Sequence, residues 1–239
     1  MSSQITNKTT LKSWGKLLEN GWVRVGTEFI RDRYVRHGEE SEPHDLALDP
    51  ANAALFDEET WQMLLEIQQA PMCQVMPLRY IIEGLQFSKS QRKVLRKNED
   101  LKCIIRPYQQ NETTDKLFEK WYKARFGRVL PLSIWIENGN KPFRSHEIAV
   151  YDKDKLVACS FFDPTPVGNF SAIACYDPDE EKRSLGTYTL LLEIEHTAAQ
   201  KKYAHYPGTA FHQPSVFDYK KKFNTVEWFD WESETWQKL

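Results

Sequence analysis

The sequence contains no long hydrophobic run. No apolar stretch among its 239 residues approaches the roughly 20 that a membrane-spanning helix requires. The first ten residues, Met1 to Thr10, are too polar for a signal peptide. We therefore expect a cytoplasmic protein that does not bind membranes.

Cysteine is scarce, and the four cysteines stand apart. Cys73, Cys103, Cys159 and Cys175 form no C-x-x-C pair and have no nearby histidine at ligand spacing. This pattern excludes a recognisable zinc or iron–sulfur site. We expect four reduced thiols, mostly buried in strands, and neither a metal nor a cofactor.

Charge is nearly balanced overall but unevenly placed. The net charge is −2, and 13% aromatic and 28% charged residues are typical of a folded globular protein rather than a disordered chain. Residues 38–69 carry nine acidic side chains and no lysine or arginine, whereas residues 88–106 carry seven basic ones. The acidic segment is expected to begin as a loop and to continue as a helix.

The basic segment has helical spacing. Lys89, Arg92, Lys93, Arg96 and Lys97 fall at i, i+3, i+4, i+7 and i+8, so a helix starting at Ser88 presents them as one stripe. Such a stripe can follow the phosphates of a nucleic acid, and it can equally be a solvated surface. Its concentration on one face favours RNA.

Residues 176–188 predict a helix N-terminus beside the edge of a sheet. A β-rich segment ends at Tyr176, a charged turn follows, and an amphipathic helix begins after Ser184. Ser184 is expected to be its N-cap, and Gly186 lets a ligand approach the backbone. The first-turn N–H groups would bind a phosphate or an oxyanion, although a capped core helix explains the same pattern.

The order of the expected elements indicates an α+β fold. Three strands over residues 146–176 precede the Ser184 helix, and strands near 203–209 and 226–231 follow it. Antiparallel strands, one packed helix and a further strand are the organisation of a GNAT-like acyltransferase core. We expect this domain over residues 76–239, with a strand over 78–85, behind an N-terminal region (residues 1–75) of helix, hairpin (residues 22–34) and acidic insertion. A helix capped by Thr113 or Thr114 is expected between the basic helix and these strands.

Four segments resemble the arginyl and leucyl tRNA-protein transferases. They are GWVRVG at 21–26, PLR at 77–79 followed by SKSQRKVL at 88–95, the segment 176–188, and DYKKKF at 218–223. They occur in the family's order. The resemblance covers roughly residues 17–26 and 72–231.

The resemblance implies transfer of arginine or leucine from a charged tRNA to the N-terminal α-amino group of a protein, which marks that protein for degradation. The ester is already activated, so the enzyme needs only to orient the amine, take its proton and stabilise an oxyanion. The resemblance implies catalytic roles for Leu185, Gly186, Thr187 and Tyr219. The implied substrate-binding residues are Arg79, Lys89, Gln91, Arg92, Lys93, Arg96, Asp163, Tyr176, Asp177, Arg183, Ser184 and Lys220.

The sequence also departs from the family. The family's N-terminal cysteine pair is absent, only Cys73 remains of its second cluster, and Phe161 stands where the family has an aspartate, with Asp163 two residues on. The acidic segment 38–69 would repel acidic acceptors unless it lies away from the site. An acyl-CoA-dependent N-acyltransferase and a non-catalytic tRNA- or protein-binding relative therefore remain alternatives.

Overall fold

The computed structural model describes residues 11–25, 28–36, 62, 71–136 and 145–239. The acidic segment predicted over 38–69 lies outside these ranges, apart from Gln62. The elements follow in this order: α1 (Leu11–Glu19), β1 (Val23–Val25), β2 (Glu28–Ile30), β3 (Tyr34–Arg36), β4 (Met72–Ile81), α3 (Lys89–Lys97), β5 (Lys102–Pro107), α4 (Glu112–Phe126), η2 (Leu132–Ile134), β6 (His146–Asp152), β7 (Lys155–Pro164), β8 (Gly168–Tyr176), η3 (Pro178–Arg183), α5 (Leu185–Ala199), β9 (Ala204–Phe211), η4 (Asp218–Lys221), β10 (Val226–Asp230) and β11 (Thr235–Lys238). No helix in the described ranges is long and apolar enough to cross a membrane.

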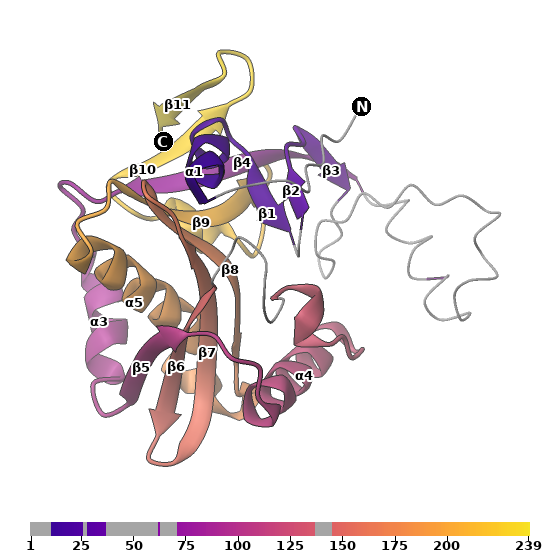
Figure 1. Cartoon of the computed structure of the whole chain (residues 1–239), viewed down its shortest axis with the longest axis vertical. Helices are drawn as coiled ribbons and strands as arrows, with labels where there is room; N and C mark the ends of the chain where they lie inside the picture. The colour runs from indigo at the N-terminus through magenta and orange to yellow at the C-terminus, as the bar shows by residue number, and fades with distance from the viewer. Residues whose placement is uncertain (1–10, 26–27, 37–61, 63–70, 137–144) are drawn as a thin grey trace.

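The largest sheet has nine strands and is mostly antiparallel. It forms the centre of the molecule (Figure 1). Its strand order is β11-β10-β4-β9-β8-β7-β6-β5, and β3 also pairs with β4. The parallel pair is β8 with β9, and α5 connects these two strands. Their pairing runs only from Gly168↔Ala204 to Phe170↔Tyr206, although β8 continues to Tyr176 and β9 to Phe211. The two strands therefore diverge after Phe170 and Tyr206, and we call this point the β8–β9 fork.

Helices cover both faces of this sheet. Ala149, Cys159 and Phe161 pack under α4, whereas Ile148 and Val150 pack with the first turns of α5. Neighbouring residues of one strand point to opposite faces, so α4 and α5 lie on opposite sides of the sheet (Figure 1). A strand covered on both faces buries side chains on both sides, so nearly every residue of β7 is buried.

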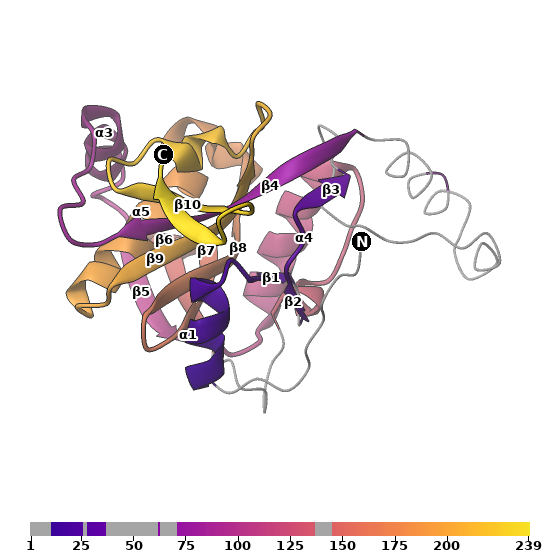
Figure 2. The same cartoon turned by 90° about the horizontal axis from the view of Figure 1, so that it is seen from above.

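The N-terminal elements pack against the same sheet, as seen from above in Figure 2. Trp14 and Leu18 of α1 and Phe29 of β2 share a buried cluster with Phe170 of β8 and Tyr206 of β9. The predicted domain boundary between residues 75 and 76 falls inside β4, whose residues Met72–Ile81 form one continuous strand.

The local predictions agree well with the structure. The hairpin over residues 22–34, the basic helix after Ser88 and the three strands before α5 are confirmed. Cys73, Cys159 and Cys175 are buried thiols within strands, while Cys103 is exposed, and none of the four forms a disulfide. An α+β fold with a mostly antiparallel sheet is confirmed as well.

Three details of the prediction were wrong. The cap of α4 is Asn111, whose side chain accepts the Thr114 N–H at 3.0 Å, so neither Thr113 nor Thr114 is the cap. The strand expected over 78–85 begins at Met72 and ends at Ile81, because it pairs with β3, β9 and β10 rather than following its own composition. Strand β11 was not predicted.

Candidate active site

A cavity of about 590 Å³ opens where β8 and β9 diverge. Its walls come from the second half of β8, the first turn of α5, the end of α4 and the segment around η4. Because the strands separate here, the backbone groups on their facing edges do not pair with each other, although β8 stays paired with β7 and β9 with β4. The fork itself therefore creates a space into which a ligand can reach.

Aromatic side chains line much of the cavity. Trp121 and Phe126 of α4 lie edge to face, with ring centroids 5.9 Å apart, and Trp121 also lies 6.3 Å from the ring of Tyr176. Trp135 and Phe217 complete this wall. Flat aromatic surfaces of this kind stack on nucleobases and enclose apolar side chains.

The first turn of α5 forms another wall, through Ser184, Leu185, Gly186 and Thr187. The first N–H groups of a helix have no partner within it and attract anions. Ser184 stands at the N-cap position, but it adopts a left-handed conformation (φ 56°, ψ 45°) and its side chain caps nothing. The expectation that Ser184 caps α5 was therefore wrong, because its backbone turns the hydroxyl away from the first-turn N–H groups.

Gly186 is closely approached by Tyr176. A Cβ atom added at Gly186 would lie 3.2 Å from Cε1 of the Tyr176 ring. The glycine thus lets the tyrosine ring lie against the start of α5 at the cavity wall. A larger residue at position 186 would displace the ring or narrow the cavity.

Tyr219 and Lys220 close the cavity from η4. The Lys220 ammonium donates to the carbonyl of Thr209 at 3.3 Å and lies 4.8 Å from the centre of the Phe217 ring. Burial lowers the pKa of Lys220 to about 8. Burial likewise raises the pKa of Tyr219 to about 12, so its hydroxyl stays protonated at neutral pH.

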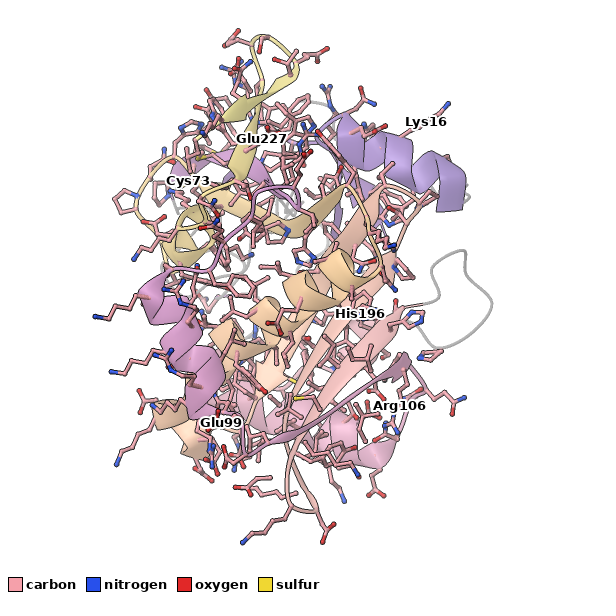
Figure 3. The ribbon with its side chains drawn as sticks, turned by 90° about the vertical axis from the view of Figure 1, so that its left-hand side faces the viewer. Lys16, Cys73, Glu99, Arg106, His196 and Glu227 are labelled. Carbon is pink, nitrogen blue, oxygen red and sulfur yellow. The ribbon has the colours of Figure 1, made fainter. Side chains whose placement is uncertain are left out.

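The predicted basic helix is α3. Lys89, Lys93 and Arg96 are exposed and line a shallow depression, together with Ser88 and Ser90. In Figure 3, basic side chains of α3 extend away from α5, which runs beside it. The other two basic residues of the stripe also touch the backbone: Arg92 donates to the Phe87 carbonyl and Lys97 to the Lys182 carbonyl.

The end of α3 is attached to the segment that leads into α5. Asn98, the C-cap of α3, is buried, and its side-chain amide donates to the Arg183 carbonyl at 3.0 Å. Leu95 of α3 also packs in the cluster that contains Leu185 and Tyr188 of α5. The basic stripe and the anion-attracting helix end therefore belong to neighbouring, directly contacting elements.

The described residues contain no group of histidine, cysteine, aspartate and glutamate side chains arranged to hold a metal ion. The chemistry considered below rests on the side chains and backbone groups named above.

Comparison with known proteins places these features in a family. The model for the C terminus of arginine-tRNA-protein transferase matches residues 103–230, more than half of the chain. An aspartate/glutamate leucyltransferase of Shewanella oneidensis is 32% identical over 173 residues, covering 66% of this chain and 69% of that protein. The chain belongs to the arginine-tRNA-protein transferase family.

Other relatives of this transferase carry the same name. An aspartate/glutamate leucyltransferase of Pseudomonas paraeruginosa is 27% identical, over 66% of this chain and 72% of that protein. One of Campylobacter jejuni is 30% identical, over 56% of this chain and 62% of that protein. Among solved structures, L-PGS from Bacillus licheniformis is similar with a TM-score of 0.49 and 10% identity, over 64% of this chain and 57% of that one. A conserved protein of unknown function from Staphylococcus epidermidis is similar with a TM-score of 0.39 and 11% identity, over 77% of this chain and 65% of that one.

Membership makes the chain an enzyme, an aminoacyl-tRNA-protein transferase. All residues that line the cavity lie within the matched range 103–230, whereas α3 precedes it. The structure brings together seven of the predicted site residues at the cavity. These are Tyr176, Ser184, Leu185, Gly186, Thr187, Tyr219 and Lys220.

Other predicted substrate-binding residues of the transferase form ion pairs within the protein. Asp163 is fully buried against Arg24, and Arg79 pairs with Glu227 on β10 at 2.6 Å. The Arg183 guanidinium donates two hydrogen bonds of 3.0 Å to the Asp100 carboxylate.

Asp177 and Gln91 also have partners within the protein. Asp177 is buried between Lys120 and Lys155, at 2.6 and 2.7 Å. Burial alone would raise its pKa, but the two lysines hold it down at about 2. Gln91 completes the capping box with Ser88 and donates to the Lys222 carbonyl at 3.2 Å. These residues shape the transferase around its cavity, and their side chains are not among those that line it.

Sequence reasoning missed the aromatic wall and one cation. The spacing of Trp121 predicts the buried face of a helix and gives no sign that the ring also borders a cavity, and Phe126 has no signal of its own. Arg125 precedes Phe126 in the sequence and lines the same cavity from its exposed position. The only available signal was the unusual density of aromatic residues around position 121.

Proposed function

We propose that this transferase moves leucine from charged tRNA to the α-amino group of an N-terminal aspartate or glutamate. The observation that supports it best is the cavity at the β8–β9 fork, where an uncapped helix N-terminus faces aromatic walls. The curated relatives are named for leucine transfer to these two residues. Glu181 is the one carboxylate among the described residues that line the cavity, so its walls suit an apolar side chain better than a guanidinium.

The parts of the cavity match the parts of the reaction. The first-turn N–H groups of Leu185, Gly186 and Thr187 would stabilise the oxyanion that forms when the amine attacks the ester. Aromatic walls would hold the terminal adenosine and the leucine side chain. The basic stripe of α3 would contact the phosphates of the acceptor stem.

Arg125 would select an acidic acceptor. It lies at the exposed edge of the cavity, 5.5 Å from the Phe126 ring, and makes no ion pair within the described ranges. A guanidinium binds a carboxylate through two parallel hydrogen bonds. Arg125→Gln should therefore weaken transfer to Asp and Glu peptides, while Lys123→Gln, which changes an exposed cation outside the cavity on the same helix, should not.

Several wider features of the family are included in the proposal. The parallel, diverging β8–β9 pair joined by α5 supports a GNAT-like acyltransferase core. The acceptor would be marked for degradation through its new N-terminal residue. The reaction would take place in the cytoplasm, where charged tRNA is available.

Transfer assays test this proposal directly. The full chain is incubated with radiolabelled leucyl- or arginyl-tRNA and with peptides that begin with Asp, Glu or Ala. We expect label on the Asp and Glu peptides from leucyl-tRNA. Label only from acetyl-CoA, offered with amines in a parallel assay, would instead identify an acyl-CoA-dependent N-acyltransferase, and no label from any donor would indicate a binding protein.

A further inference from the structure

A row of polar residues runs along α5 from the cavity into the core. Gly186, Thr189, Glu193 and Thr197 are spaced three or four residues apart and so share one face of the helix. The last three are buried. A polar face on a buried helix is costly unless each group has a partner.

The partners of this row come from the two arms of the fork. Thr197 lies 3.0 Å from Asn169 of β8 and 3.0 Å from His205 of β9. The Glu193 carboxylate accepts a hydrogen bond from Ser171 of β8, and one of its oxygens lies 3.5 Å from Nε2 of His205. Glu193 therefore sits where β8 and β9 separate, directly behind the cavity.

Burial and nearby charges set the pKa of Glu193. Only 2% of the residue is exposed, and burial raises its pKa to about 7. Burial lowers the pKa of the neighbouring His205 to about 3, so this histidine is neutral near pH 7 and supplies no compensating charge. The compensating positive charge comes from Lys220, which lowers the pKa of Glu193 while Glu193 raises that of Lys220.

Titratable groups surround this pair from every packed element. They are Tyr80 of β4, Asp163 of β7, His205 of β9 and Tyr219 of η4, with Arg125 of α4 and Glu181 of η3 on the cavity side. The Tyr80 hydroxyl donates to the Lys220 carbonyl at 2.9 Å, which fixes the backbone of Lys220 against the sheet. Lys220 lines the cavity, and its charge acts on the buried Glu193 carboxyl.

We propose that Lys220 is the base that takes the proton from the attacking amine, and that Glu193 behind it is the positioning residue that sets its charge. This inference rests on the proposed aminoacyl transfer. The acceptor ammonium gives one proton to neutral Lys220, and its nitrogen then forms a bond to the ester carbonyl carbon and releases its second proton to water. The bond from that carbon to the ribose oxygen then breaks, and the oxygen keeps the electron pair and takes the proton back from Lys220.

The proton affinities suit this exchange. A free α-amino group has a pKa of about 7.7 to 8.0, and proton transfer is efficient between groups of similar pKa. Lys220, with a pKa of about 8, is close to that match. An ordinary lysine, with a pKa near 10.4, would remain almost fully protonated at neutral pH.

The first test needs no tRNA. The full chain is treated with the N-hydroxysuccinimide ester of acetate over a range of pH, and acetylation of Lys220 is followed by peptide mass spectrometry. We expect half-maximal reactivity near pH 8 in the wild type and roughly one pH unit lower in Glu193→Gln, because a negative charge has been removed. Glu195→Gln, on the exposed side of α5, should leave the profile in place. Half-maximal reactivity near pH 10 in the wild type would overturn the proposal even if Glu193→Gln does not fold.

The second test uses the transfer reaction. Lys220→Gln and Lys220→Arg should both lower kcat/KM about 100-fold, because arginine keeps the charge but cannot release its proton. In Glu193→Gln the acidic limb of the kcat/KM profile should move to lower pH, a change that loss of stability alone would not produce. Full activity of Lys220→Arg would refute the role of Lys220 as the base. So would a folded Glu193→Gln variant in which the acidic limb of the kcat/KM profile does not move. A wild type without any transfer would refute the proposed function and leave the acetylation result to judge the Lys220–Glu193 pair.

Discussion

The guanidinium of Arg24 in β1 lies 2.5 Å from the Asp163 carboxylate in β7, and both side chains are withdrawn from solvent. The same guanidinium donates to the Trp135 carbonyl at 2.8 Å, and Ser145 donates to the second oxygen of Asp163 at 2.6 Å. Trp135 is part of the cavity wall. This ion pair therefore connects the N-terminal hairpin, the sheet and the active-site wall.

Removing one partner of the Arg24–Asp163 pair should strongly destabilise the protein. Arg24→Met leaves the Asp163 carboxylate buried without its charged partner, and we expect a loss of about 3–5 kcal/mol in the free energy of unfolding, measured in urea. Lys116→Met, which removes the exposed Lys116–Glu112 pair of α4, should lower the free energy of unfolding far less, because solvent screens that pair. Equal costs for the two variants would show that the buried pair has no special role.

The two serines that stand at helix N-cap positions should respond differently to alanine. Ser88 accepts the Gln91 N–H and takes part in a capping box, so Ser88→Ala should cost about 1 kcal/mol. Ser184 caps nothing, so Ser184→Ala should change the free energy of unfolding by less than about 0.5 kcal/mol. Thermal or urea unfolding of both variants checks this. The contrary ranking would mean that Ser184 caps α5 in solution.

Charge reversal on α3 should weaken tRNA binding. In Lys89→Glu, Lys93→Glu and Arg96→Glu we expect lower affinity and a salt dependence whose slope falls by roughly one for each phosphate that the variant no longer binds. Lys16→Glu on α1, at the far end of the molecule in Figure 3, is the control and should leave both quantities unchanged. Binding is measured by filter retention at several salt concentrations. If all four variants behave alike, the stripe is a solvated surface.

Asp177 should contribute stability that depends on pH. Its pKa is about 2 in the folded state and about 3.9 in an unfolded chain, so its stabilisation is present above about pH 4 and disappears as the pH falls towards 2. Because Lys120 and Lys155 are about half exposed, we expect Asp177→Asn to cost about 1–2 kcal/mol at pH 7. The difference from the wild type, followed by urea unfolding, should shrink towards pH 3. A difference that stays constant with pH would exclude the ion pairs as its cause.

The sequence could predict most of the elements, because their signals are local. Ser88 and Gln91 specify the start of α3 by contacts three residues apart, and the stripe of Lys89, Lys93 and Arg96 follows from helical spacing alone. The strands before α5 alternate or run apolar over a few residues each. The first turn of α5 was also correctly placed beside the end of a strand.

The candidate site could be predicted only in part. Leu185 to Thr187, Tyr219 and Lys220 do meet at one cavity, whereas Asp163, Asp177, Arg79 and Arg183 lie outside its lining and form ion pairs within the protein. A charged residue in a family motif has the same letter whether it faces a substrate or an internal partner. Arg79 and Glu227, for example, are 148 positions apart, and no spacing rule relates them.

The sequence alone determined the type and order of most helices and strands, which helix face is basic and which family the chain resembles, since these depend on neighbouring residues. The tertiary structure alone decided that β8 and β9 diverge, that Ser184 turns left-handed, and that Glu193 is buried beside His205 where the two strands separate. These features arise from packing between segments that are distant in the chain. Burial and long-range contact set the proton affinity and partner of each charged group, and neither is encoded in local spacing.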